Sequence, residues 1–584
     1  MVKLNSQKKQ ETENKNFRLS FLRNTAFLFL LLIVVKLFFL QVIDHEMYAK
    51  AAENRHNVFL DLLPKRGQIY FQNLKSPEET TPAALNKDIY IVFVDPKIVK
   101  DSKQDTKNLA QILAQKLELN EQDVLTKITK ERSRYEVIKK RVSGDIVDEL
   151  KLENLGGVYF DNEPSRFYPE KNLASQTLGY LGYNKKDLPQ GYYGLEGYFN
   201  ELLSGTSGYL STEKSAGGGW ITLLPRNKKS AIDGADVVLT IDRTLEYVAC
   251  EALKKGVVKL QAKGGTIIIM NPKDGAVLAL CNEPNFDPNN YGTVTDLSLF
   301  NNDAIFTPYE PGSVFKVITM AGALDAGKVT PDTTFVDTGM LRIGPDVIRN
   351  AGNKSYGLQN MTGVLRDSIN TGAVFAAEKL GLEKFKGYVQ DFGFGVLTGL
   401  ELDEEVPGNI NSLNNKKPIY LATASFGQGL TATPIQLISS YAAVANKGLL
   451  FKPYVISKIK YSDGHEEKTK PRLVKQVISE RTARILSAMM VVVIEEGHGK
   501  AAGVKGYHIA GKTGTAQIPS PDGKYATDAT NQTFIGFGPV DDPQFVMLVK
   551  YVEPKVDYAE SSAVPTFGEI AKFLVQYLEI PPFN

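Results

Sequence analysis

The sequence predicts an α+β protein of several domains: a membrane-spanning helix, a mixed middle domain, and a last domain whose antiparallel sheet lies between helical layers. Three observations support this fold class. The chain has 584 residues, which is more than one domain usually holds. Residues 25–43 are apolar apart from Lys36 and Gln41. In the carboxyl-terminal part, strand-like segments precede and follow a long, mostly helical stretch.

The apolar segment 25–43 predicts a transmembrane anchor, because at helical rise it is long enough to cross a hydrocarbon core. Residues 1–24 are polar and mostly basic, whereas residues 44–46 carry no Lys or Arg. This asymmetry predicts a cytoplasmic amino terminus and an extracytoplasmic bulk. A cleaved signal peptide is the alternative, but the run is long for one, so we favour an uncleaved anchor. We expect Lys36 to extend to the membrane interface; contact with a partner helix is the alternative.

Residues 44–235 predict a mixed domain that contains no catalytic constellation. Pro64 and Gly67 break the chain just before a strand that begins near Tyr70. Residues 108–132 carry apolar side chains near helical spacing, which predicts two amphipathic helices around Asn120. A stretch at 226–234, rich in Lys, Asn and Gly, marks the boundary to the last domain.

The last domain, 236–584, supplies the strands and helices of the predicted sandwich. A turn signal at 271–275 separates two strands and predicts a hairpin. A closing amphipathic helix is expected at the carboxyl-terminal end. The predicted elements are a strand at 236–242, a helix at 243–256, strands at 266–270, 276–280, 533–538 and 545–551, and a helix at 566–578.

The segment 309–320 contains the best candidate for a nucleophile. Pro311 and Gly312 end the preceding element, so a helix can begin at Ser313, and an apolar run behind it gives that helix a face to bury. On a helix, Ser313 and Lys316 share a face. A serine hydroxyl needs a base, and a lysine serves as one when burial or a nearby cation lowers its pKa. The chain has other Ser-x-x-Lys matches, at Ser6, Ser211 and Ser457, so the pattern by itself is weak evidence.

Two motifs downstream strengthen this candidate. The first is Ser368-Ile369-Asn370, which places a hydroxyl and an amide two residues apart. Ser412-Leu413-Asn414 matches the same Ser-x-Asn pattern equally well, but we interpret it as a polar loop. Lys512, Thr513, Gly514 and Thr515 form the chain's one Lys-Thr-Gly sequence. A glycine in a strand allows close approach of a ligand, and a lysine with two hydroxyls suits a substrate carboxylate.

In this order, the three motifs resemble those of the active-site serine penicillin-recognising enzymes, which include penicillin-binding proteins and serine β-lactamases. The resemblance implies the penicilloyl-serine transferase fold over about residues 235–578. In the middle domain, residues 66–67, 166–169 and 194–197 resemble landmarks of the non-catalytic pedestal of class B, or monofunctional, penicillin-binding proteins. We interpret these landmarks as salt links and turns that hold the middle domain together. Where that class usually has Asp-Arg-Asn-Gly after Arg-Gly-x-Ile, this chain has residues 70–73, Tyr-Phe-Gln-Asn.

The resemblance implies a peptidoglycan D,D-transpeptidase, a target of β-lactams, that forms an acyl-enzyme on Ser313 with Lys316 as base. Ser368 would pass the proton to the leaving D-alanine, and Asn370 would hold Lys316 and the substrate backbone. Lys512, Thr513 and Thr515 would receive the substrate carboxylate beside Gly514, and the N–H groups of Ser313 and Thr515 would form the oxyanion hole. The implied partners are a membrane glycan polymerase and division proteins, because residues 310–313 and 497–502 resemble the division (septal) type.

Other functions remain open. An elongation-type transpeptidase, a D,D-carboxypeptidase and a β-lactamase would use the same nucleophile, and a β-lactam sensor or cell-wall scaffold would not be an enzyme. Residues 506–513 also match the phosphate-loop pattern, but the prolines that follow leave no room for the helix that such a loop requires.

Composition excludes several further classes. A net charge of +2 gives no broad basic surface for nucleic acid. The five histidines form no metal-binding pair, and two cysteines are too few for a disulfide framework, so we expect no metal and no cofactor. Whether Cys250 and Cys281 pair is left open.

Overall fold

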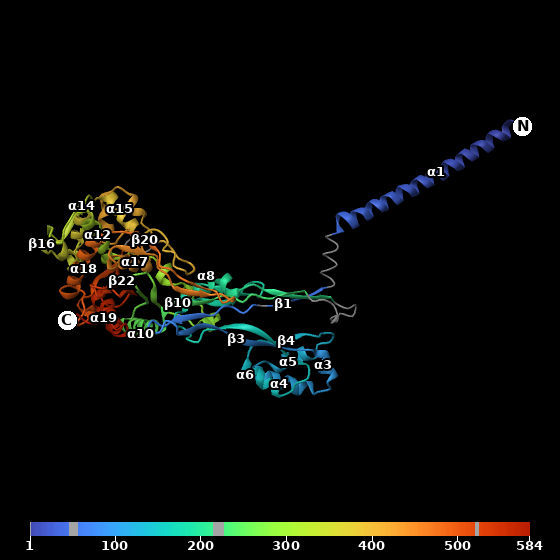
Figure 1. The fold of residues 1–584 in the computed structure, drawn as a ribbon, viewed down its shortest axis with the longest axis horizontal. Helices are drawn as coiled ribbons and strands as arrows, with labels where there is room; N and C mark the ends of the chain where they lie inside the picture. Colours follow the sequence, from blue (N-terminus) through green and yellow to red (C-terminus); the bar gives the residue numbers. More distant parts are fainter. Residues whose placement is uncertain (1, 46–56, 63, 214–226, 520–524, 584) are drawn as a thin grey trace. The chain divides into compact units, whose positions relative to one another are not determined.

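The computed structural model describes residues 2–45, 57–62, 64–213, 227–519 and 525–583 (Figure 1). The chain divides into two compact units. One unit comprises residues 1–64 and 206–232. The other comprises residues 65–205 and 233–584 and holds the three sequence motifs.

The first unit contains the apolar helix and a small sheet. Helix α1 (Val2–Phe38) continues into a π-helical turn η1 (Phe39–Ile43). Its stretch Leu19–Ile43 contains an 18-residue window with a mean hydropathy of 2.8 and no buried residue, so the stretch is long and apolar enough to span a membrane. The helix includes residues for which the sequence predicted only a polar tail. The sheet has the antiparallel order β1 (Asn57–Leu62), β8 (Gly208–Glu213), β9 (Asn227–Lys229).

In the second unit, one seven-stranded sheet is shared by the middle and last parts of the chain. Its order is β19-β18-β10-β2-β3-β4, with β5 also paired to β3, and β10 lies parallel to β2. The strands are β2 (Ile69–Gln72), β3 (Thr80–Val94), β4 (Glu136–Ser143), β5 (Val158–Phe167), β10 (Asp236–Asp242), β18 (Ile456–Lys460) and β19 (Glu466–Lys468).

The two predicted amphipathic helices are present as α4 (Thr106–Leu117) and α5 (Glu121–Ile128). Asn120 caps α5, and its side chain accepts hydrogen bonds from the backbone of Gln122 and Asp123. Their apolar faces share a core with strands β3 to β5. The other elements here are α3 (Pro96–Asp101), α6 (Gly144–Leu152), α7 (Ser175–Leu178), β6 (Tyr180–Tyr183), β7 (Pro189–Tyr192), α8 (Gly194–Tyr198) and α9 (Asn200–Ser204).

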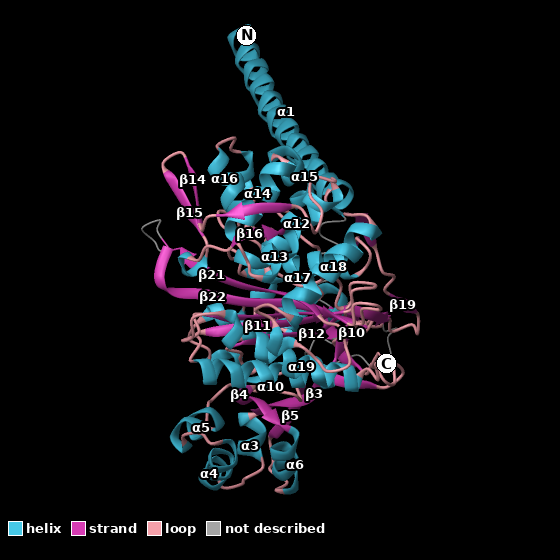
Figure 2. Cartoon of the chain, turned by 90° about the vertical axis from the view of Figure 1, so that its left-hand side faces the viewer, coloured by secondary structure: helices cyan, strands magenta, loops and turns pink. Residues whose placement is uncertain are grey.

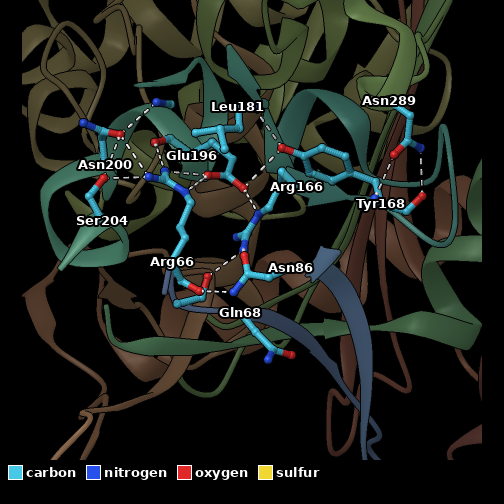
Figure 3. Close-up of polar contacts among 12 residues, drawn as sticks. Arg66, Gln68, Asn86, Arg166, Tyr168, Leu181, Glu196, Asn200, Ser204 and Asn289 are labelled. Atoms are coloured by element: carbon cyan, nitrogen blue, oxygen red, sulfur yellow. Dashed lines mark hydrogen bonds and ion pairs between the residues drawn. The ribbon is translucent and has the colours of Figure 1, made fainter. Parts of the chain in front are cut away.

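The three pedestal-like landmarks meet in one buried charge cluster (Figure 3). The carboxylate of Glu196 is fully buried and accepts hydrogen bonds from Arg66 Nε (2.8 Å), Arg166 Nε (2.6 Å) and the Tyr168 hydroxyl (3.2 Å). Arg166 also donates to the Gly67 carbonyl at 2.7 Å. Burial alone would raise the pKa of Glu196, but the two guanidinium charges outweigh it and hold that pKa below its usual value.

Replacing Glu196 with glutamine is expected to destabilise the protein by roughly 3–5 kcal/mol, because two buried guanidinium groups lose their counter-charge. The loss should appear as a lower Tm of the full-length protein in detergent. Glu149→Gln removes the exposed partner of Lys116 and should leave Tm nearly unchanged. Equal Tm values for Glu196→Gln and the wild type would show that the cluster does not stabilise the fold.

The predicted sandwich is present around a five-stranded antiparallel sheet of order β12-β11-β23-β22-β21. Figure 2 shows helices on both sides of this sheet. On one side lie α12 (Lys316–Asp325), α13 (Met361–Arg366), α17 (Pro434–Ala445) and α18 (Glu480–Glu495), and on the other α10 (Arg243–Leu260) and α19 (Ala563–Tyr577). The strands are β11 (Gly264–Met270), β12 (Val277–Glu283), β21 (Ala510–Pro519), β22 (Tyr525–Gly538) and β23 (Phe545–Val552).

Helix α10 (Arg243–Leu260) continues beyond Gly256, where the sequence predicted its end. A Cβ atom at Gly256 would lie 1.8 Å from the Tyr551 hydroxyl, so the glycine is explained by packing on the sheet rather than by a helix end. The closing helix α19 (Ala563–Tyr577) packs beside α10. Cys250 of α10 and Cys281 of β12 form a disulfide, which settles the pairing that the sequence left open.

Between β12 and β21 the chain is mostly helical, as predicted. The helices are α11 (Asp303–Phe306), α12 (Lys316–Asp325), α13 (Met361–Arg366), α14 (Asn370–Leu380), α15 (Leu382–Asp391), α16 (Pro418–Ser425), α17 (Pro434–Ala445) and α18 (Glu480–Glu495). The short strands are β13 (Thr334–Asp337), β14 (Met340–Ile343), β15 (Asp346–Arg349), β16 (Gly357–Asn360), β17 (Leu449–Phe451) and β20 (Leu473–Gln476).

Candidate active site

Ser313 lies in a 3₁₀ turn, η4 (Gly312–Phe315), and α12 begins directly after it at Lys316. The sequence predicted that the helix starts at Ser313. The observed turn is instead the tighter 3₁₀ type, and Gly312 at its start adopts a φ of 59°, a conformation that L-residues rarely take. Val314 and Phe315 are buried, and Ser313 is partly exposed between them and Gly312.

Lys316 is 1% exposed, and its amine lies among three oxygens. Its Nζ is 2.5 Å from the Ser368 carbonyl, 2.7 Å from Asn370 Oδ1 and 3.3 Å from Ser368 Oγ. A neutral amine has two N–H donors for the two carbonyl oxygens and one lone pair for the serine hydroxyl. Burial and the charge of Lys512 lower the pKa of Lys316 well below its usual value, so a neutral form is favoured.

Lys512 contacts the same hydroxyl. Its fully buried Nζ donates to Ser368 Oγ at 3.0 Å, to the Thr513 carbonyl at 3.1 Å and to Thr513 Oγ1 at 3.3 Å. Burial lowers the pKa of Lys512 to about 7, against the opposing charges of Glu560 and Asp367. The Ser368 hydroxyl can therefore accept from Lys512 and donate to Lys316, which forms a continuous proton path.

Strand β21 brings Gly514 against the Ser313 turn. A Cβ atom at Gly514 would lie 2.9 Å from Val314 Cγ1 and 3.1 Å from the Pro311 carbonyl oxygen. Any side chain there would push the turn away, which explains the glycine of Lys-Thr-Gly. Thr515, one residue on, accepts a hydrogen bond from the backbone N–H of Ala559 at 3.3 Å.

The structure thus brings all eight predicted site residues into one neighbourhood. One expected contact is absent: among the residues described, no hydrogen bond joins the Ser313 hydroxyl to Lys316. Such contacts are often long in enzymes without substrate. The phosphate-loop reading is excluded, because β21 runs as a strand through Lys512 and Thr513 to Pro519.

The chain also matches known sequence families over most of its length. The profile of the penicillin-binding protein transpeptidase domain matches residues 265–572, more than half of the chain. That of the penicillin-binding protein dimerisation domain matches residues 61–239. The chain belongs to the penicillin-binding protein transpeptidase family. The family predicted from the three motifs and the predicted fold class are therefore confirmed, and the protein is an enzyme of the transpeptidase class.

Relatives of this penicillin-binding protein match it almost from end to end. Stage V sporulation protein D of Bacillus subtilis is 33% identical over 97% of this chain and 86% of the relative. A protein of Mesostigma viride named peptidoglycan D,D-transpeptidase FtsI homolog is 31% identical over 94% of both chains. Penicillin-binding protein 2X of Streptococcus thermophilus, a solved structure at 22% identity, shares the fold with a TM-score of 0.76 over 89% of this chain and 80% of its own.

In this penicillin-binding protein, Asn350 braces the Ser-x-Asn motif, a contact that sequence reasoning missed. Its Oδ1 accepts from the backbone N–H groups of Asn370 (3.0 Å) and Thr371 (3.2 Å). Its Nδ2 donates to both carboxylate oxygens of buried Asp337, at 3.0 and 2.9 Å, which fixes the orientation of the amide. The Asn370 side chain donates to the Arg349 carbonyl at 2.8 Å. Asn350 and its neighbour thus hold the residue that contacts Lys316.

Replacing Asn350 with leucine is expected to slow acylation by a fluorescent penicillin roughly ten- to hundredfold, because Asn370 loses its backbone anchor and shifts relative to Lys316. The rate is measured from the amount of labelled full-length protein after reactions quenched at a series of times. Asn414→Leu changes the exposed asparagine of the second Ser-x-Asn match and serves as the control. If Asn350→Leu acylated at the same rate as the control, Asn350 would not be needed to position Asn370.

Proposed function

We propose that this protein is a D,D-transpeptidase that cross-links peptidoglycan stem peptides through an acyl-enzyme on Ser313. One observation carries the proposal: Lys316 and Lys512, far apart in the sequence, meet at the hydroxyl of Ser368 beside the Ser313 turn. Two buried amines with lowered pKa values around one hydroxyl suit proton transfer to and from a serine nucleophile.

In the first half-reaction, Ser313 Oγ attacks the carbonyl carbon of the penultimate D-alanine, and neutral Lys316 takes the hydroxyl proton. The peptide bond to the terminal D-alanine breaks. That residue leaves as a free amine after receiving the proton through Ser368. In the second half-reaction, the amine of another stem peptide attacks the ester carbonyl and displaces Ser313. The proton of that amine returns to the serine oxygen through Lys316.

The residues of strand β21 would bind the donor peptide. The substrate's terminal carboxylate fits the charge of Lys512 and the hydroxyls of Thr513 and Thr515. Gly514 gives the substrate backbone access to the strand. The N–H groups of Ser313 and Thr515 would stabilise the tetrahedral oxyanion. A β-lactam would acylate Ser313 by the same steps, and its ring-opened product stays bound as an ester.

The domain division and membrane orientation extend this proposal. Residues 25–43 would anchor the chain, residues 1–24 would be cytoplasmic, and the pedestal 44–235 and catalytic part 236–584 would lie outside. In a bacterium this places the enzyme on the outer face of the cytoplasmic membrane, where a membrane glycan polymerase supplies its substrate. The polymerase and division proteins are the partners we propose.

We place the activity at the division septum, because residues 310–313 and 497–502 resemble those of the division type and one relative is named an FtsI homolog. A relative of similar identity is named for stage V of sporulation, which favours a spore wall as the second candidate site. A fluorescent fusion separates these. A septal band supports the first, a signal confined to the developing spore supports the second, and lateral-wall signal contradicts both.

Cross-linking with defined components tests the activity itself. The full-length protein is incubated with a lipid-linked precursor and a glycan polymerase, and the digested glycan is analysed for cross-linked dimers. We expect dimers that disappear when penicillin is added. Release of D-alanine without dimers would show a D,D-carboxypeptidase instead. Unchanged monomers and no D-alanine release would favour a scaffold.

A further inference from the structure

A row of side chains crosses the five-stranded sheet at the level of the Lys-Thr-Gly glycine. The strand registers place one residue of each strand opposite the next, on the face that carries α12 and α17. From β21 to β12 the row is Gly514, Thr533, Lys550, Thr266 and Asn282. The adjacent row on this face is apolar from β22 to β12: Ile535, Leu548, Ile268 and Leu280. Lys550 therefore stands in the middle of a buried sheet face.

Lys550 is 2% exposed, yet no ion pair within the described part of the chain neutralises it. Its Nζ lies 4.3 Å from the centre of the Tyr309 ring, within the range of a cation–π contact. Burial lowers the pKa of Lys550 to about 8, against the opposing charge of Asp303. The neighbouring Thr266 is already engaged, since its hydroxyl donates to Asn282 at 2.9 Å. An apolar side chain of similar length, such as methionine, would be expected to pack here at lower cost.

Tyr309 connects this lysine to the nucleophile's turn. Its hydroxyl is 3.0 Å from Thr533 Oγ1, in the same row as Lys550. Its backbone exchanges two hydrogen bonds with Ala432, each 3.0 Å long. Only residues 310–312 separate it from Ser313, and that turn in turn lies against Gly514 at the end of the row. The ring is therefore held on both sides immediately before the segment that presents Ser313.

We propose that Lys550 is a positioning residue for Ser313, acting through the Tyr309 ring. The Lys550 cation holds the Tyr309 ring in place, and the ring holds the start of the segment 309–313. At the other end of that segment, the turn packs against Gly514. The inference rests on Ser313 being the nucleophile of the proposed function. The role of Lys550 goes beyond the proposed function, because Lys550 touches neither substrate nor reacting atoms and acts only by holding Ser313 in position.

The test measures the second-order rate of acylation by a fluorescent penicillin, together with Tm, on the full-length protein in detergent. Lys550→Met is expected to slow acylation about tenfold or more, since small displacements of a nucleophile are costly, while Tm does not fall. Lys458→Met, on β18 in the other large sheet, is the matched control and should acylate at the wild-type rate. In a Tyr309→Leu background, Lys550→Met should have no further effect.

The Tyr309 variants give a second test, should Lys550→Met be recovered unfolded. Tyr309→Phe keeps the ring beneath the cation and should retain more than about a third of the wild-type rate. Tyr309→Leu should lose about tenfold or more. Equal rates for these two variants would overturn the inference, as would a wild-type rate for Lys550→Met or independent effects in the double variant. A wild-type protein that takes no label would instead contradict the proposed function.

Discussion

Replacing Ser313 with alanine is expected to abolish covalent labelling by a fluorescent penicillin. Without the hydroxyl, no ester can form, whatever the state of Lys316 and Lys512. Because Ser313 is partly exposed and its hydroxyl makes no hydrogen bond among the described residues, the change should leave the fold intact. Labelled protein is measured by in-gel fluorescence after denaturation, and Tm is measured on the same preparation.

Ser457→Ala is the matched control for this experiment. Ser457 and Lys460 form another Ser-x-x-Lys match, but they lie on strand β18, where residues three apart point to opposite faces. This variant should label like the wild type. Retained labelling of Ser313→Ala at an unchanged Tm would end the assignment of Ser313 as the nucleophile.

Replacing Lys316 with methionine is expected to reduce the acylation rate by about 10²–10⁴, the range that a positioned base contributes. Lys316 is 1% exposed and its amine contacts the Ser368 and Asn370 oxygens, so water has little access to replace the lost base. In the wild type the rate should fall as the pH is lowered through the depressed pKa of Lys316, because the protonated amine accepts no proton. The methionine variant should lose this dependence.

Lys460→Met, which changes the lysine of the strand match, controls for loss of a positive charge and should keep both rate and pH profile. A Lys316→Met variant with a wild-type rate and the same acid limb would show that another group is the base. Ser368 and Lys512 would then be the next candidates, since they share the same hydrogen-bond path.

Much of the catalytic part could be predicted because its elements are marked locally. The strand 236–242 has the observed bounds of β10, and a turn signal separates the strands that became β11 and β12. Asn120 marked the start of α5, since a side-chain acceptor before an apolar periodicity is a helix cap. The motif residues could be found because the chemistry of serine acyl transfer restricts residue types at short spacing.

The contacts that orient those residues carry no such local signal. Asn350 lies in an irregular segment and reaches Asn370 only after the chain has folded back on itself. In the sequence, Lys550 looks like an ordinary strand residue. Only the folded sheet brings its amine to the Tyr309 ring. Gly256 looks like a helix end in the sequence, but a glycine is needed there because the Tyr551 hydroxyl of a distant strand leaves no room for a side chain. Each depends on long-range packing, which a single sequence does not display.

Mapping the penicilloyl adduct tests the central claim most directly, because it identifies the residue that carries the acyl group. The wild-type protein is acylated with penicillin, digested, and sequenced by tandem mass spectrometry. We predict a single adduct on Ser313, which is lost in the Lys316→Met variant over the same reaction time. An adduct on any other residue, with Ser313 unmodified, would contradict the claim that Ser313 is the nucleophile served by Lys316, Ser368 and Lys512.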